Sequence, residues 1–510
     1  MAVDVEEQHG GAREYERRLS EQGTLVIAPS VAEGIADDAA IKEAALKEAA
    51  VAVAVPHSAH RERSWYMHML LIVAVELASE SSRGIVLPTL FSYSELLGGD
   101  MVFMGLLTAL FSIGRFVSSL FFGWLSDRIS FKHVYIISGT ISVVGNLMYV
   151  LAYAKPFRSK FMLGLSRTII GFGAGNRGVC RANIAALTRL DQRLQYFTHF
   201  ATVVFLAYAL TPGLAGLFDG LDVTYLHGYL PINEYTAPGL VLAVSNLLTL
   251  FMATAVFDPT ITRDDAPGSP PKPVQVDATV QVEAAAPRAV PTPSTSERVV
   301  KIGIVVFIFL NFIARGIVSV FETINIPLFL QSQQPIAAAV EVEMDKQNDS
   351  LTADASSFYF VIGLLGLVTY AVVQLLRKRV ADTSFLLFGL VTILAGNVIM
   401  LILAMVVSAA NGATTLDFNA FVVAEILIWS IGCPLVSCVA VSAFSRVLGT
   451  RPQGFWMGVF GSAASISRMV LPFLPGVLPT WELVFLVNNI LCGLCIVLLI
   501  FFLRLATSSS

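Results

Sequence analysis

Twelve apolar segments, each of about 20 residues or more, alternate with polar connections along this 510-residue chain. A helix of about 20 apolar residues crosses the hydrocarbon core of a bilayer, and it satisfies its own backbone hydrogen bonds there. The chain is 55% hydrophobic and only 14% charged, and its mean hydropathy is +0.72, as is typical of a membrane protein. The sequence therefore predicts an all-α membrane protein with many spanning helices.

The apolar segments form two sets of six. We predict them at 65–91, 101–125, 133–154, 161–187, 195–218 and 237–257, and then at 300–330, 356–376, 384–408, 419–443, 454–478 and 481–505. The stretch between the two sets is rich in proline, alanine and aspartate, a composition that cannot pack a core. The expected domains are a largely disordered cytosolic tail at 1–63, a six-helix half at 64–257, a cytosolic linker at 258–299, a second six-helix half at 300–505 and a short cytosolic tail at 506–510.

Short motifs recur at equivalent places in the two halves. The fifth and eleventh segments begin with an Arg-x-Gln-x-Phe pattern, at Arg193 and Arg451. Arg-Gly-Ile-Val occurs in both the first and the seventh segments, at Arg83 and Arg315. Internal repeats of this kind build transporters whose binding site lies between the two halves.

Lysine and arginine residues are concentrated in the connections on one side of the predicted membrane. Because basic residues favour the cytosolic side, both termini are predicted to be cytosolic, although Lys155, Arg158 and Lys160 lie in an external connection. The sequon that begins at Asn348 falls in a predicted external loop. Asn348 is therefore a candidate glycosylation site.

The first segment carries three ionisable residues, Glu76, Glu80 and Arg83, whose spacing places them on one helix face. Even the lowest estimates put the cost of a charge at the bilayer centre at about 2.5–3.5 kcal/mol, so this face cannot meet lipid. One interpretation is an internal salt bridge between Glu80 and Arg83. The other is a polar face that lines a transport pathway.

Further charged residues lie inside the later apolar segments. Those expected to face a central cavity together with the first segment are Arg167, Arg315, Glu322, Glu425 and Arg468. The three arginines in this set are expected to bind an anionic group or chloride. Arg177 and Arg181 lie near the predicted cytosolic end of the fourth segment, where snorkelling to lipid phosphates is an equally good interpretation.

The acidic residues in the membrane suggest proton coupling. Burial favours the protonated form of a carboxylic acid, whereas a nearby arginine favours the carboxylate. We therefore hypothesise that Glu76 or Glu80 carries a coupled proton. Glu322 could instead form an exposed gate, and Glu425 could carry a proton as well.

The connection between the second and third segments reads Gly123-Trp-Leu-Ser-Asp127-Arg128-Ile-Ser-Phe-Lys132. It resembles the signature loop of the major facilitator superfamily. In this reading Gly123 lets two helices approach closely, and Asp127 accepts from helix N-termini or from an arginine of the other half. Arg128 and Lys132 hold the loop at the cytosolic surface. The two residues before Lys132 replace the family's usual glycine and basic residue, which predicts a weaker latch between the states of a rocking transporter.

The fourth segment fits the superfamily's R-x-x-x-G-x-G pattern, beginning at Arg167, which in the family faces the cavity. FETINIPL from Phe321 and RPQGFWMG from Arg451 further resemble the lysosomal and vacuolar facilitators grouped with the neuronal ceroid lipofuscinosis type 7 protein. The resemblance covers about residues 64–505. It implies two six-helix halves, with helices one, four, seven and ten lining the cavity and helices three, six, nine and twelve facing lipid. It also implies an acidic organelle membrane, and some members of this group are linked to chloride conductance.

We expect a secondary active transporter that moves a small anionic or zwitterionic solute across a lysosomal or vacuolar membrane by alternating access, with the plasma membrane as the other location. The alternatives are an anion channel or uniporter on the same fold and a non-transporting membrane sensor. An enzyme is not expected, because the sequence has no nucleotide-binding loop, metal cluster or nucleophile constellation. We expect a functional monomer in the lipid bilayer, with a small-molecule or ion substrate and with no cofactor, metal or nucleic-acid partner.

Overall fold

The computed structural model describes residues 39–215, 218, 221–225, 230–267, 297–333, 347–410, 414–449 and 451–508. These residues belong to two compact units. The small unit is drawn from Met1–His68 and Thr260–Ser294, and the large unit from Met69–Pro259 and Thr295–Ser510. In the small unit, Arg61 Nε lies 2.6 Å from Asp265 Oδ1, so an ion pair joins the start of the predicted linker to the helix before the first span.

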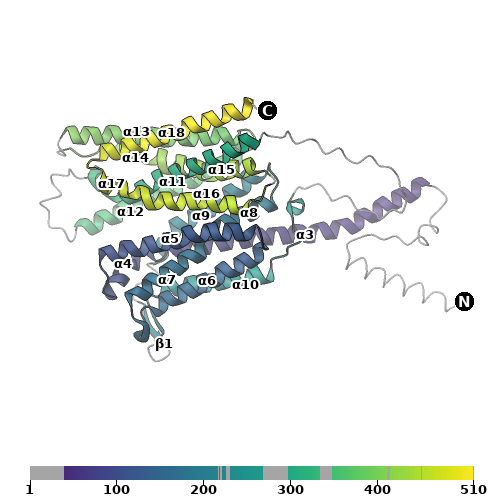
Figure 1. Ribbon diagram of the computed structural model, residues 1–510, viewed down its shortest axis with the longest axis horizontal. Coiled ribbons are helices and arrows are strands. Elements are labelled where there is room, and N and C mark those ends of the chain that lie inside the picture. The colour runs from purple at the N-terminus through teal and green to yellow at the C-terminus, as the bar shows by residue number, and fades with distance from the viewer. Residues whose placement is uncertain are drawn as a thin grey trace. The chain divides into compact units, whose positions relative to one another are not determined.

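The first half is built of helices with one short hairpin (Figure 1). Its elements are α3 (Ala39–Gly84), α4 (Leu87–Leu96), α5 (Met101–Ser126), α6 (Phe131–Leu151), η1 (Lys155–Phe157), α7 (Lys160–Gly173), η2 (Ala174–Asn176), α8 (Arg177–Leu187), α9 (Arg193–Ala215), β1 (Asp222–Tyr225), β2 (Leu230–Asn233) and α10 (Ala237–Ala255). The short helix η5 (Arg263–Asp265) follows in the predicted linker and belongs to the small unit. The two strands pair antiparallel, with Asp222 opposite Asn233.

The second half repeats the helical pattern without a hairpin in the part that the structure describes. Its elements are α11 (Glu297–Gln333), α12 (Gln347–Leu376), α13 (Asp382–Ala409), α14 (Phe418–Glu425), the π-helix η7 (Ile426–Gly432), α15 (Cys433–Leu448), α16 (Gly454–Val470), η8 (Leu471–Phe473), α17 (Leu474–Val477) and α18 (Trp481–Ser508).

Each of the predicted apolar segments coincides with a helix or with a chain of short helices, which confirms the all-α fold class. Eight of the described helices are long and apolar enough to cross a membrane. The first predicted segment is divided near Gly84, and Pro88 lies in the first turn of α4, where its missing N–H costs nothing. The fourth, tenth and eleventh are divided by 3₁₀ or π turns. These interruptions and the β1–β2 hairpin were not predicted, and α3 begins at Ala39, within the tail that was predicted to be largely disordered.

The four helices that the resemblance assigns to the lipid face carry large exposed apolar side chains. Examples are Val144 on α6, Phe251 on α10, Phe388 on α13 and Val497 on α18, whose exposed fractions range from 47% to 68%. In Figure 1, α13 and α18 run side by side along one edge of the large unit, and α6 and α10 lie together at the opposite edge. Exposed apolar surface of this extent is what lipid tails cover.

The two halves meet along helices in the middle of the large unit. Helix α16 of the second half packs against α5 and α8, and α9 of the first half packs against α12 and α15. The α5–α16 contact is close because glycines face each other: a Cβ on Gly123 would lie 2.7 Å from the carbonyl oxygen of Gly454 and 3.0 Å from the Cα of Gly458. This central interface holds the charged side chains described next.

Candidate functional site

Two cavities at the interface of the halves share four lining arginines, Arg177, Arg181, Arg315 and Arg468. The smaller cavity has a volume of about 40 Å³ and the larger a volume of about 260 Å³. Arg177 and Arg181 lie on α8 of the first half, whereas Arg315 on α11 and Arg468 on α16 belong to the second. Side chains from both halves therefore surround one space, which we call the arginine chamber.

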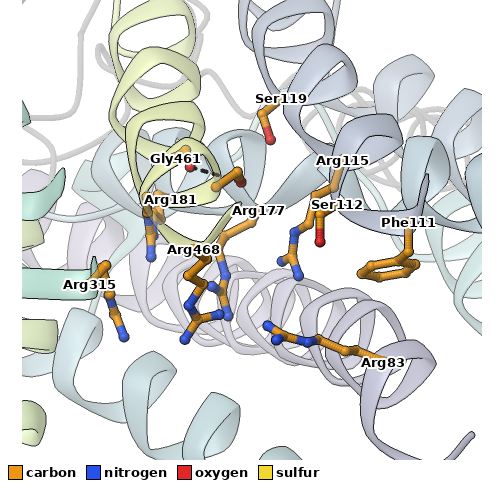
Figure 2. Close-up of a pocket in the computed structure, with 12 residues that line it drawn as sticks. Arg83, Phe111, Ser112, Arg115, Ser119, Arg177, Arg181, Arg315, Gly461 and Arg468 are labelled. Carbon is orange, nitrogen blue, oxygen red and sulfur yellow. Dashed lines mark hydrogen bonds between the residues drawn. The ribbon is translucent and has the colours of Figure 1, made fainter. Parts of the chain in front are cut away.

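The smaller cavity is lined by six arginines. Arg83 from α3 and Arg115 from α5 join the four shared ones, and the other lining residues are Phe111, Ser112, Ser119, Gly461, Ala464 and Ser465. Figure 2 shows these arginines reaching inward from different helices. None of the described residues that line this cavity is acidic. All the formal charges on this lining are therefore positive.

Two fully buried acids of α3 lie against these arginines. Arg177 Nε is 2.6 Å from Glu76 Oε1, and Arg177 Nη2 is 2.8 Å from Glu80 Oε1. Arg115 also donates to Glu80 Oε1. The acids partly balance the arginines, but six guanidinium groups stand against two carboxylates. A buried excess of like charge is costly unless an opposite charge enters the site.

Arg181 shows this excess most directly. Its side chain is 6% exposed, its guanidinium lies 5.7 Å from the centre of the Phe460 ring, and its Nε has no hydrogen-bond partner among the described residues. The ring face attracts the cation but cannot accept a directed hydrogen bond of normal strength. A ligand carboxylate, sulfonate or phosphate has the acceptor oxygens that this donor needs.

The larger cavity has a different character. Most of its remaining wall is apolar or aromatic, formed by Phe197, Phe200, Ala201, Val204 and Phe205 of α9, Val318 of α11, Tyr370 of α12, Trp429 of η7, and Cys433, Ser437 and Val441 of α15. The chamber thus has an arginine-rich side and an apolar side. None of the described residues lining either side is an acid.

The predicted cavity residues fall into three groups: those at the arginine chamber, one beside it, and those outside its described lining. In the first group, Arg83, Arg315 and Arg468 line the chamber, and Glu76 and Glu80 are buried against arginines that line it.

Arg167 lies beside the chamber. It is buried, its Nη1 donates to the carbonyl oxygen of Ser82 at 3.2 Å, and its guanidinium lies 4.7 Å from the ring centre of Phe111, which lines the smaller cavity. Arg167 therefore braces the end of α3.

Glu425 is fully buried at the end of α14, outside the described lining of either cavity. Neither of its carboxyl oxygens has a hydrogen-bond partner among the described residues. Glu322 lies in α11 and Asn348 in the first turn of α12, but their side chains are outside the described part of the structure. The gate role of Glu322 and the glycosylation of Asn348 stay predictions.

Three arginines of the arginine chamber were not among the predicted site residues. Arg115 is a lone charge in the second apolar segment, and that isolation was a usable signal for a buried functional group. Arg177 and Arg181 were considered as snorkelling residues, but Arg177 forms ion pairs with both acids of α3 and Arg181 is buried. The 3₁₀ turn η2 just before Arg177 sets the direction of α8, and sequence periodicity does not reveal it.

The signature loop closes one end of the interface. Asp127 Oδ1 accepts from the Gly454 N–H at 2.8 Å, and its Oδ2 accepts from the Phe455 N–H at 2.7 Å. The carboxylate thus caps the N-terminus of α16 across the two halves, where helix N–H groups and the helix dipole favour a negative charge. The guanidinium of Arg128 lies 4.0 Å from the ring centre of Trp124, and Lys132 donates to the carbonyl oxygen of Thr254 at 3.0 Å.

Two further hydrogen bonds join the halves at the same end of the bundle. Arg193 Nη1 donates to the carbonyl oxygen of Ser445 at 2.6 Å, and Gln374 Nε2 donates to that of Gln195 at 2.8 Å. Together with Asp127 they form what we call the latch. In this conformation the latch joins the two halves at the signature-loop end.

The comparisons with known proteins agree with this architecture. The sequence profile described as Major Facilitator Superfamily matches residues 72–449. Major facilitator superfamily domain-containing protein 8 of Xenopus laevis is 22% identical over 453 residues, which cover 80% of this chain and 84% of that protein.

Solved structures share the fold. The proton:xylose symporter XylE superposes with a TM-score of 0.63 at 11% identity, covering 85% of this chain and 95% of the symporter chain. The human organic anion transporter MFSD10 superposes with a TM-score of 0.57 at 15% identity, covering 86% of this chain and 99% of that one. At such low identity these structures show a shared fold and nothing about the solute.

Proposed function

This chain belongs to the Major Facilitator Superfamily and is a membrane transporter, and on that premise we propose that its solute is a small anion bound in the arginine chamber. One observation carries the proposal: six arginines from both halves line a single cavity, and none of the described residues lining it is acidic.

The chemistry of the site favours anions with several oxygens. Guanidinium groups bind carboxylate, sulfonate and phosphate through paired N–H···O bonds, and a hydrogen bond to a charged group contributes about 1.5–3 kcal/mol. An anion that contacts Arg181 of the first half and Arg468 of the second would be held by both halves at once. Its binding would then influence the relative position of the halves, which is what alternating access requires.

The contacts of Glu80 support a proposal of proton coupling. Its carboxylate accepts a hydrogen bond from Arg115 and forms an ion pair with Arg177, and both arginines also line the chamber. An incoming anion therefore competes with Glu80 for the same donors. When Glu80 takes up a proton, its hold on the two arginines weakens, so the proton and the anion bind together. This is the arrangement of a proton–anion symporter.

A second candidate function is an anion uniporter or channel on the same fold. The observation that favours it is the small volume of the arginine-rich cavity, about 40 Å³, which suits a compact ion such as chloride. The two functions differ in coupling, because a channel carries current without a proton gradient. We place the protein in a lysosomal or vacuolar membrane, where an acidic lumen would supply that gradient.

Transport by purified protein in liposomes tests the proposal, with pH and voltage set separately and with chloride and small organic anions as solutes. Arg315→Gln and Arg468→Gln should each lower the transport efficiency for the best anion about 10- to 100-fold, as expected for the loss of one charge-assisted contact. Arg504→Gln, an exposed residue of α18, is the matched control and should transport normally. Full transport by both chamber variants would refute anion binding in the arginine chamber. The absence of any transport by the wild type would favour the alternative of a non-transporting sensor.

A further inference from the structure

The arginine chamber joins two spaces of opposite character. The small cavity presents guanidinium and hydroxyl groups, and the larger one presents mainly rings and aliphatic side chains. Arg177, Arg181, Arg315 and Arg468 belong to both walls, so they lie at the junction. A ligand that touches these four arginines is in reach of the apolar wall as well.

The apolar wall is a continuous feature of the fold. Phe197, Ala201, Val204 and Phe205 occupy positions i, i+4, i+7 and i+8, so they form one stripe along α9 that faces the cavity. Across from the stripe, Val441 of α15 is among the residues that complete the wall. An apolar surface of this kind in the middle of a transporter must be covered by lipid-like or aromatic matter, or else be wetted whenever the chamber opens.

We infer that the substrate is an amphiphilic anion, with a carboxylate, sulfonate or phosphate head on the shared arginines and an apolar body against the α9 stripe. This inference rests on the proposed anion transport and narrows its substrate class. A compact, fully hydrophilic anion would satisfy the arginines but leave the apolar wall in contact with water. The volume of about 260 Å³ is below that of most drug-sized sites, so the body is one ring or a short chain.

A homologous series of ligands tests the inference. The probes are linear alkyl sulfonates from methanesulfonate to octanesulfonate, titrated against the full-length protein in nanodiscs, with the dissociation constant obtained from thermal stabilisation. Burial of each added methylene should tighten binding about threefold to fourfold until the chain fills the cavity. A plateau after a few carbons indicates a soluble amphiphile. Continued tightening to octanesulfonate would contradict an apolar body limited to one ring or a short chain.

Isosteric variants distinguish binding of the alkyl chain to the apolar wall from its partitioning into the bilayer. Val204→Thr and Val441→Thr keep the side-chain shape and place a hydroxyl in the wall, so they should weaken hexanesulfonate several-fold and leave methanesulfonate unchanged. Val244→Thr on α10, whose side chain is 49% exposed and outside both cavities, controls for partitioning of the probe into lipid.

The two proposals can fail separately. Suppose that affinity is independent of chain length and unchanged in the wall variants, while Arg468→Gln still weakens the binding of every probe. The inferred amphiphilic substrate is then wrong, and the proposed anion site stands. If no sulfonate binds saturably, or if Arg468→Gln leaves the affinity for every sulfonate unchanged, then both the proposed anion site and the inferred amphiphilic substrate are wrong.

Discussion

Arg177 connects the buried acids of α3 to the arginine chamber. It forms ion pairs with Glu76 and Glu80 and at the same time lines both cavities. Glu80 in turn accepts from Arg115, so two donors of the chamber are held by one acid. The acids thereby set how many guanidinium groups an anion can use. In the proposed transport cycle, protonation of these acids and binding of the anion are linked, so each would change the affinity for the other by the same factor.

Glu80→Gln is expected to remove much of this link. In the wild type, anion affinity should rise as the pH falls, since protonation of Glu80 releases Arg115 and Arg177. The glutamine variant mimics the neutral acid at every pH, so it should bind anions about tenfold more tightly at neutral pH and show a flattened pH profile. Titrations from pH 5 to pH 8 measure this.

Glu76→Gln is examined in the same way, because Glu76 shares Arg177. Glu62→Gln, an exposed residue of α3, is the control and should keep the wild-type profile. If both buried-acid variants retain the complete pH dependence, the coupling proposal is wrong.

For single residues, the sequence identified which charged side chains are buried better than it identified their ion-pair partners. A buried charge in an apolar segment is visible from composition, and Glu76, Glu80, Arg83, Arg315 and Arg468 were singled out on that ground. Which arginine meets which acid depends on how α3, α5 and α8 are rotated about their axes. Sequence spacing fixes faces within one helix but not the rotation between helices, so the pairing of Glu80 with Arg115 could not be foreseen.

Helices α5 and α16 determine how closely the halves approach. Their glycines bring the two backbones together, and α8 joins them through Gly178, where a Cβ would lie 3.0 Å from the Cα of Gly458. Gly123 was predicted to allow such an approach from the signature loop alone. The π-helix η7 next to Glu425 was not predicted, because one extra residue per turn leaves no mark in an almost uniformly apolar run.

Gly123→Ala should separate these two helices. The added methyl would meet the backbone of Gly454 and Gly458, and overpacking of this kind costs about 1–3 kcal/mol in the latched state. We expect transport to slow about tenfold or more and the latched conformation to lose population. Gly105→Ala on the same helix is the matched control, because a Cβ there meets nothing within 4 Å. Equal rates for the two variants would show that the close approach has no role in transport.

On the scale of the whole molecule, twelve apolar segments in two halves follow from segment length and apolar character, and the structure has a helix or a chain of short helices at each of them. The conformational state does not follow from the sequence. It depends on contacts between residues more than 300 positions apart, such as Asp127 with Gly454 and Phe455. The signature loop indicated that Asp127 would accept hydrogen bonds across the halves, but not which helix would supply them.

Asp127→Ala should open the latch. The change removes the acceptor of two backbone N–H groups and the negative charge at the start of α16, which together are worth about 1–3 kcal/mol. The population open at the signature-loop end should rise about tenfold or more. Spin labels at Arg189 and Arg377, one in each half, would report it as a longer distance component in pulsed electron paramagnetic resonance. Asp191→Ala changes an exposed residue and is the control, so it should leave the distance distribution unchanged. An unchanged distance distribution in Asp127→Ala would show that the latch does not stabilise this conformation.

The central claim is that one anion is held by arginines of both halves, and a double-mutant cycle on its binding tests this most directly. The measurement is the dissociation constant of hexanesulfonate for the wild type, Arg181→Gln, Arg468→Gln and the double variant. We predict that each single change weakens binding at least tenfold and that the two losses are coupled by about 0.5 kcal/mol or more. Unchanged affinity in either single variant would contradict a shared site between the halves.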